Sequence, residues 1–248
     1  MTHESVVDIQ AGRIPGFVRQ SFQCEPDGSL RDIPVLPVTR LLIDLEVQEP
    51  SVDLSMLTHV ILSDLGATLQ IFKLAGQVYG NVDACPVRIE DCISDLGLRE
   101  CMAALSVPTA MHNDLRNGIA DMWSHSREIA LHAQLIAEDT PDVPPEEAYL
   151  VGLCHAIGRL PQLLNWDSQA ARWDSQAART MDDAGMGVEL ARRWLLPHFV
   201  VESLLGAQMD GSPSPWPKIL QAAHARASRS SFDCVSSKDP RRRFLHAV

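Results

Sequence analysis

The chain has 248 residues, of which 46% are hydrophobic and 21% charged, which excludes disorder as a whole and indicates a globular protein with a sizeable core. Its formal net charge of -11 at pH 7 would repel phosphate backbones, so nucleic acid is not an expected partner. The concentrated basic run at 241–243 is typical of a solubilising tail.

The distribution of cysteines and apolar residues indicates the compartment. No two cysteines form a C-x-x-C pair, so neither a zinc knuckle nor a small disulfide framework is predicted. No run of eighteen apolar residues occurs, and no apolar stretch follows the polar N-terminus. We therefore expect a cytoplasmic protein with reduced thiols, without a signal peptide or a membrane partner. The cysteines are Cys24, Cys85, Cys92, Cys101, Cys154 and Cys234.

The N-terminal third passes from an irregular leader into short helices. Residues 1–32 are polar and broken by glycine and proline, so no regular element is expected there. A helix is predicted over 37–48, because a proline suits its first turn and apolar residues follow at helical spacing. Those apolar residues are Val38, Leu41, Leu42 and Leu45. Asp53 and Asp64 can cap the next two helices, the second of which stops near Gly80.

Two further short helices are predicted on either side of Gly97. Apolar residues repeat at helical spacing over 89–96 and again over 98–105. Cys92 and Cys101 lie on these apolar faces, so we expect them to be core thiols rather than reactive ones.

A long helix is predicted over 113–138, followed by a turn rich in proline and aspartate. The next helix begins at Pro145, where two glutamates suit its positive end. Gly152 is expected to allow close helix packing, and Gly158 is expected to close the helix as a C-cap.

A tandem duplication occupies residues 166–179, where Trp-Asp-Ser-Gln-Ala-Ala-Arg occurs twice. Seven residues make about two helical turns and fall far short of a solenoid repeat, so we expect a local insertion without chemistry. Further helices are predicted around 188–195, from Pro197 onward and over 217–229.

No segment shows the sustained alternation of a strand, so the sequence predicts an all-α fold. We expect an N-terminal helical lobe over 33–112 and a second helical lobe over 113–231. The leader at 1–32 and a polar tail at 232–248 would flank them.

Several spaced segments, in this order along the chain, carry a family resemblance. They are Ile33-Pro34-Val35-Leu36-Pro37, 64–80, 88–97, Trp123-Ser124-His125-Ser126, 146–148, 152–158, Gly187 and Trp194-Leu195-Leu196-Pro197. Together they resemble HDOD proteins, the HD-related output domains of bacterial signalling, over about residues 25–230. The resemblance implies an HD-like helical bundle in two lobes.

The resemblance also implies where a metal site would lie. In catalytic HD phosphohydrolases, paired His and Asp side chains hold metals that activate water against a phosphate ester. His125 and His155 match the first two histidines of that site, but Ala156 stands where the motif has Asp. Alanine offers no lone pair and removes a hard ligand. The histidine pair that relatives often carry further on falls at Ala207 and Gln208, which are not credible ligands.

The remaining candidates do not complete this vestigial site. Asp182 and Asp183 precede a glycine, where relatives often have a histidine, and could contribute a carboxylate. His125 and His155 are either a residual metal pair or two histidines hydrogen-bonded inside the lobe. We favour the second interpretation, because two imidazoles fall short of the three protein ligands usual in catalytic sites. We therefore predict no bound metal, no cofactor and no catalytic residue.

Three other histidines are set aside on sequence grounds. His132 lies two helical turns after His125, too far for easy co-ligation. His198 and His224 are single helix-borne histidines with nothing nearby in sequence, so they are expected to be surface or boundary residues.

Three functions stay open. The first, which we favour, is a non-catalytic regulatory module that binds a protein partner in trans, as the resemblance implies for bacterial signalling. The second is a divergent metal-dependent phosphohydrolase, and the third is a nucleotide-type ligand sensor that uses the vestigial cleft. An exposed apolar patch would favour the first, a bound metal the second and a deep polar pocket the third.

Overall fold

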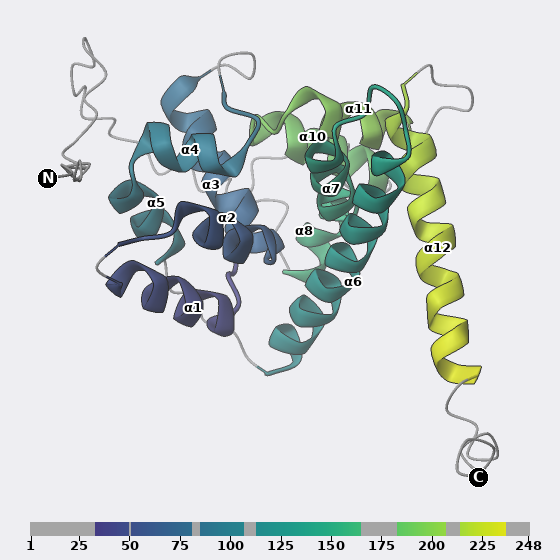
Figure 1. Ribbon diagram of the computed structural model, residues 1–248, viewed down its shortest axis with the longest axis horizontal. Coiled ribbons are helices and arrows are strands. Elements are labelled where there is room, and N and C mark those ends of the chain that lie inside the picture. The colour runs from purple at the N-terminus through teal and green to yellow at the C-terminus, as the bar shows by residue number, and fades with distance from the viewer. Residues whose placement is uncertain are drawn as a thin grey trace, which may run out of the picture.

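The computed structural model describes residues 33–49, 51–80, 85–106, 113–164, 183–206 and 214–236. Within these ranges the chain forms helices joined by short turns, and no strand occurs, which confirms the all-α prediction (Figure 1). The elements are α1 (Pro37–Gln48), α2 (Leu54–Leu62), α3 (Leu65–Tyr79), α4 (Ile89–Leu96), α5 (Leu98–Leu105), α6 (Asn113–Glu138), α7 (Pro145–Cys154), the 3-10 helix η2 (Ile157–Arg159), α8 (Leu160–Leu163), α10 (Asp183–Arg193), α11 (His198–Gly206) and α12 (Trp216–Ser236).

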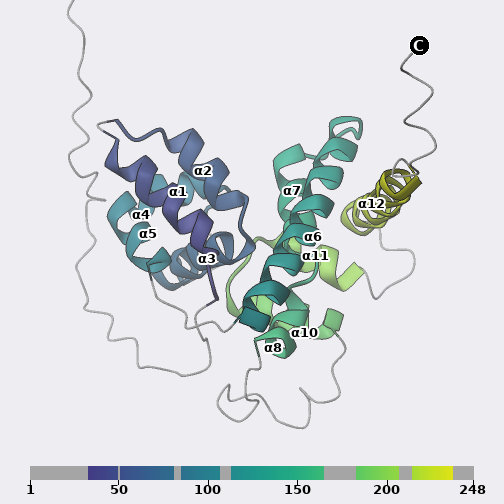
Figure 2. The ribbon, with the colours of Figure 1, turned by 90° about the horizontal axis from the view of Figure 1, so that it is seen from below.

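The helices gather into two lobes. Helices α1 to α5 form one lobe and α6 to α12 the other, with α3 on the side of the first lobe that faces α6 (Figures 1 and 2). The long helices α6 and α7 pack side by side, and α12 lies against α6 at the edge of the molecule farthest from α1. One continuous core of buried apolar side chains runs through both lobes.

Local signals in the sequence account for the helix ends of the first lobe. The Asp53 side chain accepts hydrogen bonds from the backbone N–H groups of Ser55 and Met56, which caps α2. Asp64 caps α3 by accepting from the N–H of Ala67. Gly80 ends α3 in the left-handed region, at φ 65°, which a glycine adopts without strain. These predicted ends are confirmed.

Asp64 also joins the two lobes. Its side chain is fully buried and accepts hydrogen bonds from the Leu36 N–H at 2.8 Å and from the Trp123 indole N–H at 2.7 Å. Nearby, the Tyr149 hydroxyl donates to the Leu62 carbonyl oxygen at 3.0 Å. Since Trp123 and Tyr149 belong to the second lobe, these bonds fix its orientation against the first.

Helix α1 forms as predicted, but its apolar stripe does not face the core. The four residues of the stripe remain between 45% and 59% exposed, whereas the buried residues of α1 are Thr39 and Ile43. We define the α1 stripe by these four side chains: Val38, Leu41, Leu42 and Leu45. The spacing of the apolar residues therefore predicts the helix correctly, but the apolar face of α1 is exposed to solvent.

Two glycines of the second lobe permit close approach of backbone. A Cβ on Gly152 would lie 2.5 Å from the Ala130 Cα, so α7 can touch α6 only without a side chain there, as predicted. The prediction that Gly158 closes the same helix is wrong, because α7 already ends at Cys154. Gly158 instead lies in η2, where a Cβ would overlap the backbone carbonyl of Asp183. Its role is contact with α10 rather than capping.

Cys92 and Cys101 are buried free thiols, as expected for core residues. Burial raises the pKa of the Cys101 thiol to about 12, which keeps it protonated and unreactive. The duplicated segment at 166–179 lies outside the described residues.

Within the described ranges, no helix alone has the length and apolar character needed to cross a bilayer. Helices α2 and α3 taken together would meet those two requirements, although the chain bends by 112° between them.

Candidate functional site

Two histidines predicted from the family resemblance do come together in the second lobe. His125 lies on α6, and His155 follows the last residue of α7. Their ring centroids are 5.2 Å apart with the rings nearly perpendicular. The contact depends on the close packing of α6 and α7 at Gly152, one turn before His155.

A third imidazole, which sequence reasoning missed, completes the group. His224 lies on α12, and its ring centroid is 4.7 Å from that of His155 and 5.8 Å from that of His125. One ring nitrogen from each histidine lies within 4.8 Å of the others. His224 is half-buried, which agrees with the expected boundary position, but the sequence does not predict that it meets His125 and His155. Its only sequence signal is a helical stripe that buries Ala223 and Ala227 beside it.

The imidazole of His155 is held in one orientation. Its Nδ1 lies 2.7 Å from the Gly152 carbonyl oxygen, which can only accept a hydrogen bond. Nδ1 therefore carries the proton, and Nε2 keeps its lone pair when the ring is neutral. Burial lowers the pKa of His155 to about 4, and the neighbouring His224, His125 and Arg159 act in the same direction. Burial also lowers the pKa of His224.

The other predicted site residues are placed as follows. Ala156 is buried directly after His155, so the position of the motif's Asp lies beside the histidines but carries only a methyl group. Asp183 begins α10, is 67% exposed and lies 3.9 Å from the Arg159 guanidinium, an interaction that is weak in solvent. Asp183 does not belong to the histidine group. Asp182, Ala207 and Gln208 lie outside the described residues.

The other two second-lobe histidines considered in the sequence, His132 and His198, do not belong to the group. His132 lies farther along α6 and is not a member, in keeping with its spacing from His125. Its Nδ1 atom is buried without a hydrogen-bond partner among the residues that the structure describes. His198 is exposed on α11 and contacts the ring of Phe199 at a centroid distance of 5.8 Å.

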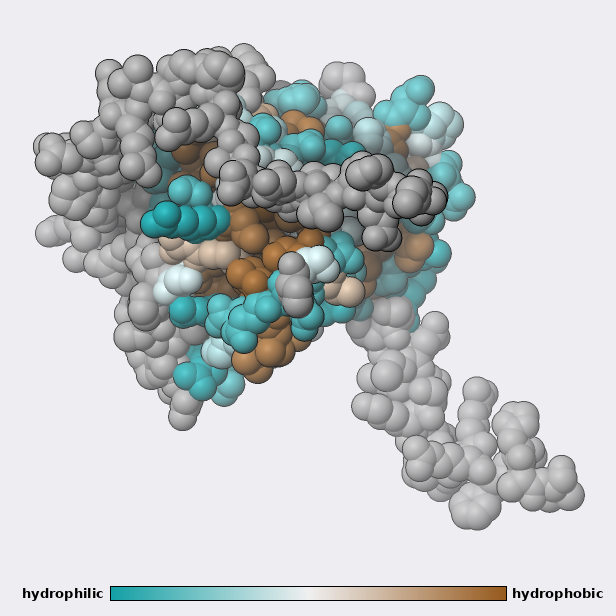
Figure 3. Space-filling model, turned by 60° about the vertical axis from the view of Figure 1, so that its left-hand side comes forward, coloured by the Kyte–Doolittle hydropathy of each residue, from teal (hydrophilic) through white to brown (hydrophobic). Residues whose placement is uncertain are grey.

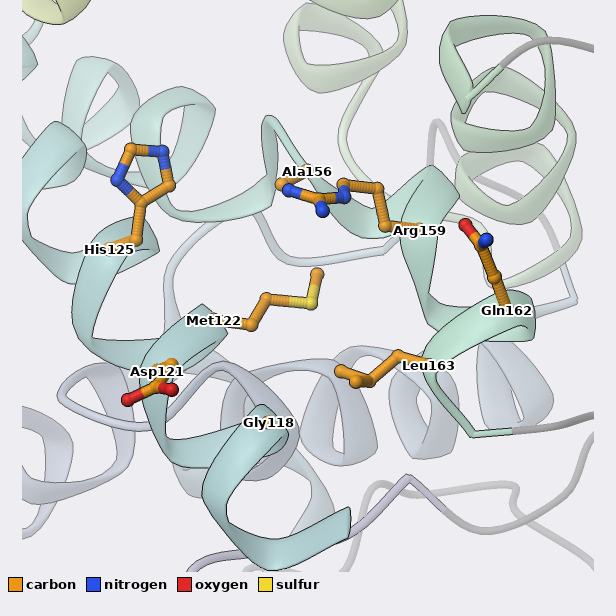
Figure 4. Close-up of a pocket in the computed structure, with 8 residues that line it drawn as sticks. All are labelled: Gly118, Asp121, Met122, His125, Ala156, Arg159, Gln162 and Leu163. Atoms are coloured by element: carbon orange, nitrogen blue, oxygen red, sulfur yellow. The ribbon is translucent and has the colours of Figure 1, made fainter. Parts of the chain in front are cut away.

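A cavity of about 400 Å³ opens beside His125 and Ala156. Met122 and Leu163 point into it from opposite walls, and the Arg159 side chain extends across the Ala156 end (Figure 4). The complete lining is Gly118, Asp121, Met122, His125, Ala156, Arg159, Gln162 and Leu163. The lining is both apolar and polar, and its one cationic side chain could meet an anionic ligand.

The donor set at this site differs from that of a His-Asp metal centre. Within the described residues, the group of ligand atoms contains three imidazole nitrogens and no carboxylate oxygen. Hard cations such as Mg²⁺ and Mn²⁺ prefer oxygen ligands, whereas imidazole suits Zn²⁺ and its neighbours in the late first row. The residues present therefore do not fit the oxygen-rich site that the resemblance implies for catalytic relatives.

Comparison with known proteins agrees with the fold. The response regulator MmoQ from Methylococcus capsulatus str. Bath is 19% identical with a TM-score of 0.63, and the match covers 80% of this chain and 87% of that one. A second structure of an MmoQ fragment is 21% identical with a TM-score of 0.57, and covers 84% and 87%. A virulence factor from Campylobacter jejuni subsp. jejuni is 15% identical with a TM-score of 0.56, and covers 80% and 77%.

No curated protein sequence gives a significant match to the chain. The HDOD domain model, in contrast, matches residues 33–208, which include both lobes up to the end of α11. Because this match spans well over half of the 248 residues, the chain belongs to the HDOD domain family.

Proposed function

We propose that this chain is a non-catalytic regulatory module of the bacterial cytoplasm, which acts in signal transduction by binding a protein partner in trans. The observation that carries the proposal is the α1 stripe, four apolar side chains on one face of a helix with 45% to 59% of each exposed. An open apolar helix face is typical of a contact surface for another protein.

The residues around the α1 stripe indicate which kind of partner surface would be complementary to it. Apolar side chains gather on this side of the N-terminal lobe, with polar side chains around them (Figure 3). On α1 itself the charged neighbours are mostly acidic, namely Asp44, Glu46 and the following Glu49. The stripe therefore suits an apolar partner surface with a basic rim, because charge complementarity speeds encounter and fixes orientation.

The vestigial site supports the non-catalytic part of the proposal. A phosphohydrolase of the HD type uses carboxylates to hold its metals, and Ala156 provides none at the position next to His155. Asp121 is the one carboxylate among the described residues that line the cavity, and it is not part of the histidine group.

One observation favours a second function, a divergent metal-dependent phosphohydrolase. His224 raises the number of convergent imidazoles to three, which is the number of protein ligands usual in catalytic zinc sites. We rank this function second, because no described side chain in the group can act as a carboxylate base beside a bound water.

Site-directed photo-crosslinking in living cells tests the first function. A photoreactive amino acid replaces Leu42 in the α1 stripe or, as the control, Asp44 on an adjacent exposed part of the same helix. We expect a discrete adduct with one protein from Leu42 only. After identification, the purified partner should bind the wild-type chain and lose at least about tenfold in affinity for Leu41→Glu.

Leu41→Glu should unfold with nearly unchanged free energy, because the side chain is 57% exposed, so lost binding cannot reflect lost folding. Equal crosslinking from Asp44, or unaltered affinity of Leu41→Glu, would contradict the proposal. An adduct with a second copy of the chain would replace partner binding by self-association.

A further inference from the structure

The three-histidine group has the geometry of a prepared ligand set. His125, His155 and His224 come from α6, the end of α7 and α12, so only the folded second lobe brings them together. Their ligand atoms lie within 4.8 Å of one another. Around a tetrahedral ion with metal–nitrogen bonds of 2.0–2.1 Å, ligand nitrogens lie about 3.3 Å apart. Side-chain rotations that move the nitrogens by roughly 1 to 1.5 Å would close the group on an ion.

A hydrogen bond to the backbone fixes the tautomer of one of the three imidazoles. The Gly152 carbonyl oxygen accepts from Nδ1 of His155 at 2.7 Å, so Nε2 is the atom left with a lone pair. Protein histidines that bind metals commonly donate their other N–H to a carbonyl or carboxylate, which fixes the ring and raises its basicity. His155 has this arrangement without any metal-induced rearrangement.

The surroundings leave room for a fourth ligand. The cavity beside the group is lined by His125 and Ala156, and the alanine side chain fills none of the space that a carboxylate would take. A water molecule or an anion entering the cavity could occupy the open position of a three-coordinate ion. Arg159, which also lines the cavity, would favour the anion.

We propose that His125, His155 and His224 form a three-imidazole site for one late first-row divalent cation, with Zn²⁺ as the best-fitting ion. The proposal is independent of the protein-binding function and replaces the metal-free site expected from the sequence. It also departs from the His-Asp centre of catalytic HD proteins. The third ligand lies on α12, beyond the 33–208 range that the family model matches, and no described carboxylate takes part.

A metal ion bound at this site would stabilise the packing of α12 against the rest of the second lobe. His224 is the one ligand that α12 contributes, and α12 otherwise rests on α6, α7 and α11 through residues such as Ala223 and Ala227. An ion that binds only the folded arrangement stabilises it by mass action. At free Zn²⁺ about one hundred times the Kd, we expect the melting temperature to rise by at least about 5 °C.

Metal titration of the full chain, stripped with chelator, tests the site. Calorimetry with Zn²⁺ should show one equivalent bound, and His224→Ala should weaken binding by at least about a hundredfold. His59→Ala, an exposed helical histidine of the first lobe, is the matched control and should bind like the wild type. Binding that His224→Ala leaves unaltered, or no stoichiometric binding by the wild type, would overturn the proposal.

A second variant tests the site independently, in case His224→Ala does not fold. His224→Cys keeps a ligand atom at the position, so Co²⁺ should give a thiolate-to-cobalt charge-transfer band that the wild type and His59→Cys lack. The wild type should show the visible bands of four-coordinate Co²⁺. A His224→Cys spectrum identical to that of His59→Cys would show that α12 does not reach the ion.

Discussion

Asp64 combines two structural tasks in one buried carboxylate. It caps α3 through Ala67, and it accepts hydrogen bonds from the Leu36 N–H and the Trp123 indole at the junction of the lobes. Burial raises the pKa of Asp64, while these hydrogen bonds act to lower it. The carboxylate tolerates burial because these hydrogen bonds, together with one from the Thr39 side chain, replace those that it would make to water.

We predict that Asp64→Ala lowers the free energy of unfolding by about 3 kcal/mol or more, because it removes the acceptor of four hydrogen bonds, from Leu36, Thr39, Ala67 and Trp123. Asp53→Ala is the matched control: Asp53 caps α2 in the same way on the exposed surface, and its loss should cost about 1 kcal/mol. Urea unfolding of both variants measures the difference. Equal losses would mean that Asp64 acts as a cap alone.

His155 should make stability depend on pH in a defined direction. Because burial lowers its pKa in the folded chain from 6.5 to about 4, the unfolded chain binds the proton more tightly between these values. The contribution of the neutral His155 ring to the free energy of unfolding is fully present above about pH 6.5 and falls as the pH drops toward 4. The loss should approach about 3 kcal/mol at the acid end.

This prediction is tested with chelator present, by urea unfolding of the wild type and His155→Gln from pH 7 to pH 4.5. The groups that face His155 are His125 and His224 from α6 and α12, and Arg159 from η2. His224 contributes in the same direction, so some pH dependence should survive in the variant. If the free energy of unfolding changed with pH equally in the wild type and in His155→Gln, the pH dependence could not be assigned to His155.

At the level of helices, the contact between α6 and α7 depends on one glycine. Gly152→Ala would place a Cβ 2.5 Å from the Ala130 Cα, and backbone there cannot give way without moving a helix. We predict a loss of at least about 2 kcal/mol in the free energy of unfolding. The same variant should weaken Zn²⁺ binding, because His155 is carried on the displaced segment.

Gly118→Ala in α6 provides the comparison. Its Cβ would meet only the Leu163 Cδ1, the far end of a flexible side chain, at 3.0 Å. Alanine also favours helix over glycine by up to about 1 kcal/mol, so this variant should be neutral or stabilising. Thermal melts of the two variants side by side measure the contrast. A neutral Gly152→Ala would show that α6 and α7 can separate freely.

Helix α1 shows the limit of periodicity as a predictor. The spacing of Val38, Leu41, Leu42 and Leu45 predicts the helix correctly, because the repeat depends only on the local backbone. Which face of the helix meets the core depends on neighbours distant in sequence, and here the core takes Thr39 and Ile43 instead. Caps such as Asp53 and Asp64 were predictable for the same reason as the helix itself, since they act within a few residues.

Across the whole molecule, the candidate site was predictable only where a motif marks it. His125 and His155 follow from the family pattern, and the structure brings them together. The helical stripe beside His224 does not indicate its partners, because these lie on α6 and at the end of α7 and meet it only through the packing of α12. The local sequence likewise predicts a helix end at Gly158, because the contact of Gly158 with Asp183 is not visible in it.

The proposal that this HDOD chain acts as a regulator without catalysing a reaction is tested by assaying hydrolysis by the purified protein. The chain, loaded in turn with Zn²⁺, Mn²⁺ and Fe²⁺, is assayed on phosphomonoester and phosphodiester substrates beside the double variant His125→Ala/His155→Ala. We predict that turnover by the wild type does not exceed that of the double variant with any ion, even where Zn²⁺ binds. Metal-dependent turnover that the double variant lacks would contradict the claim and establish the phosphohydrolase function instead.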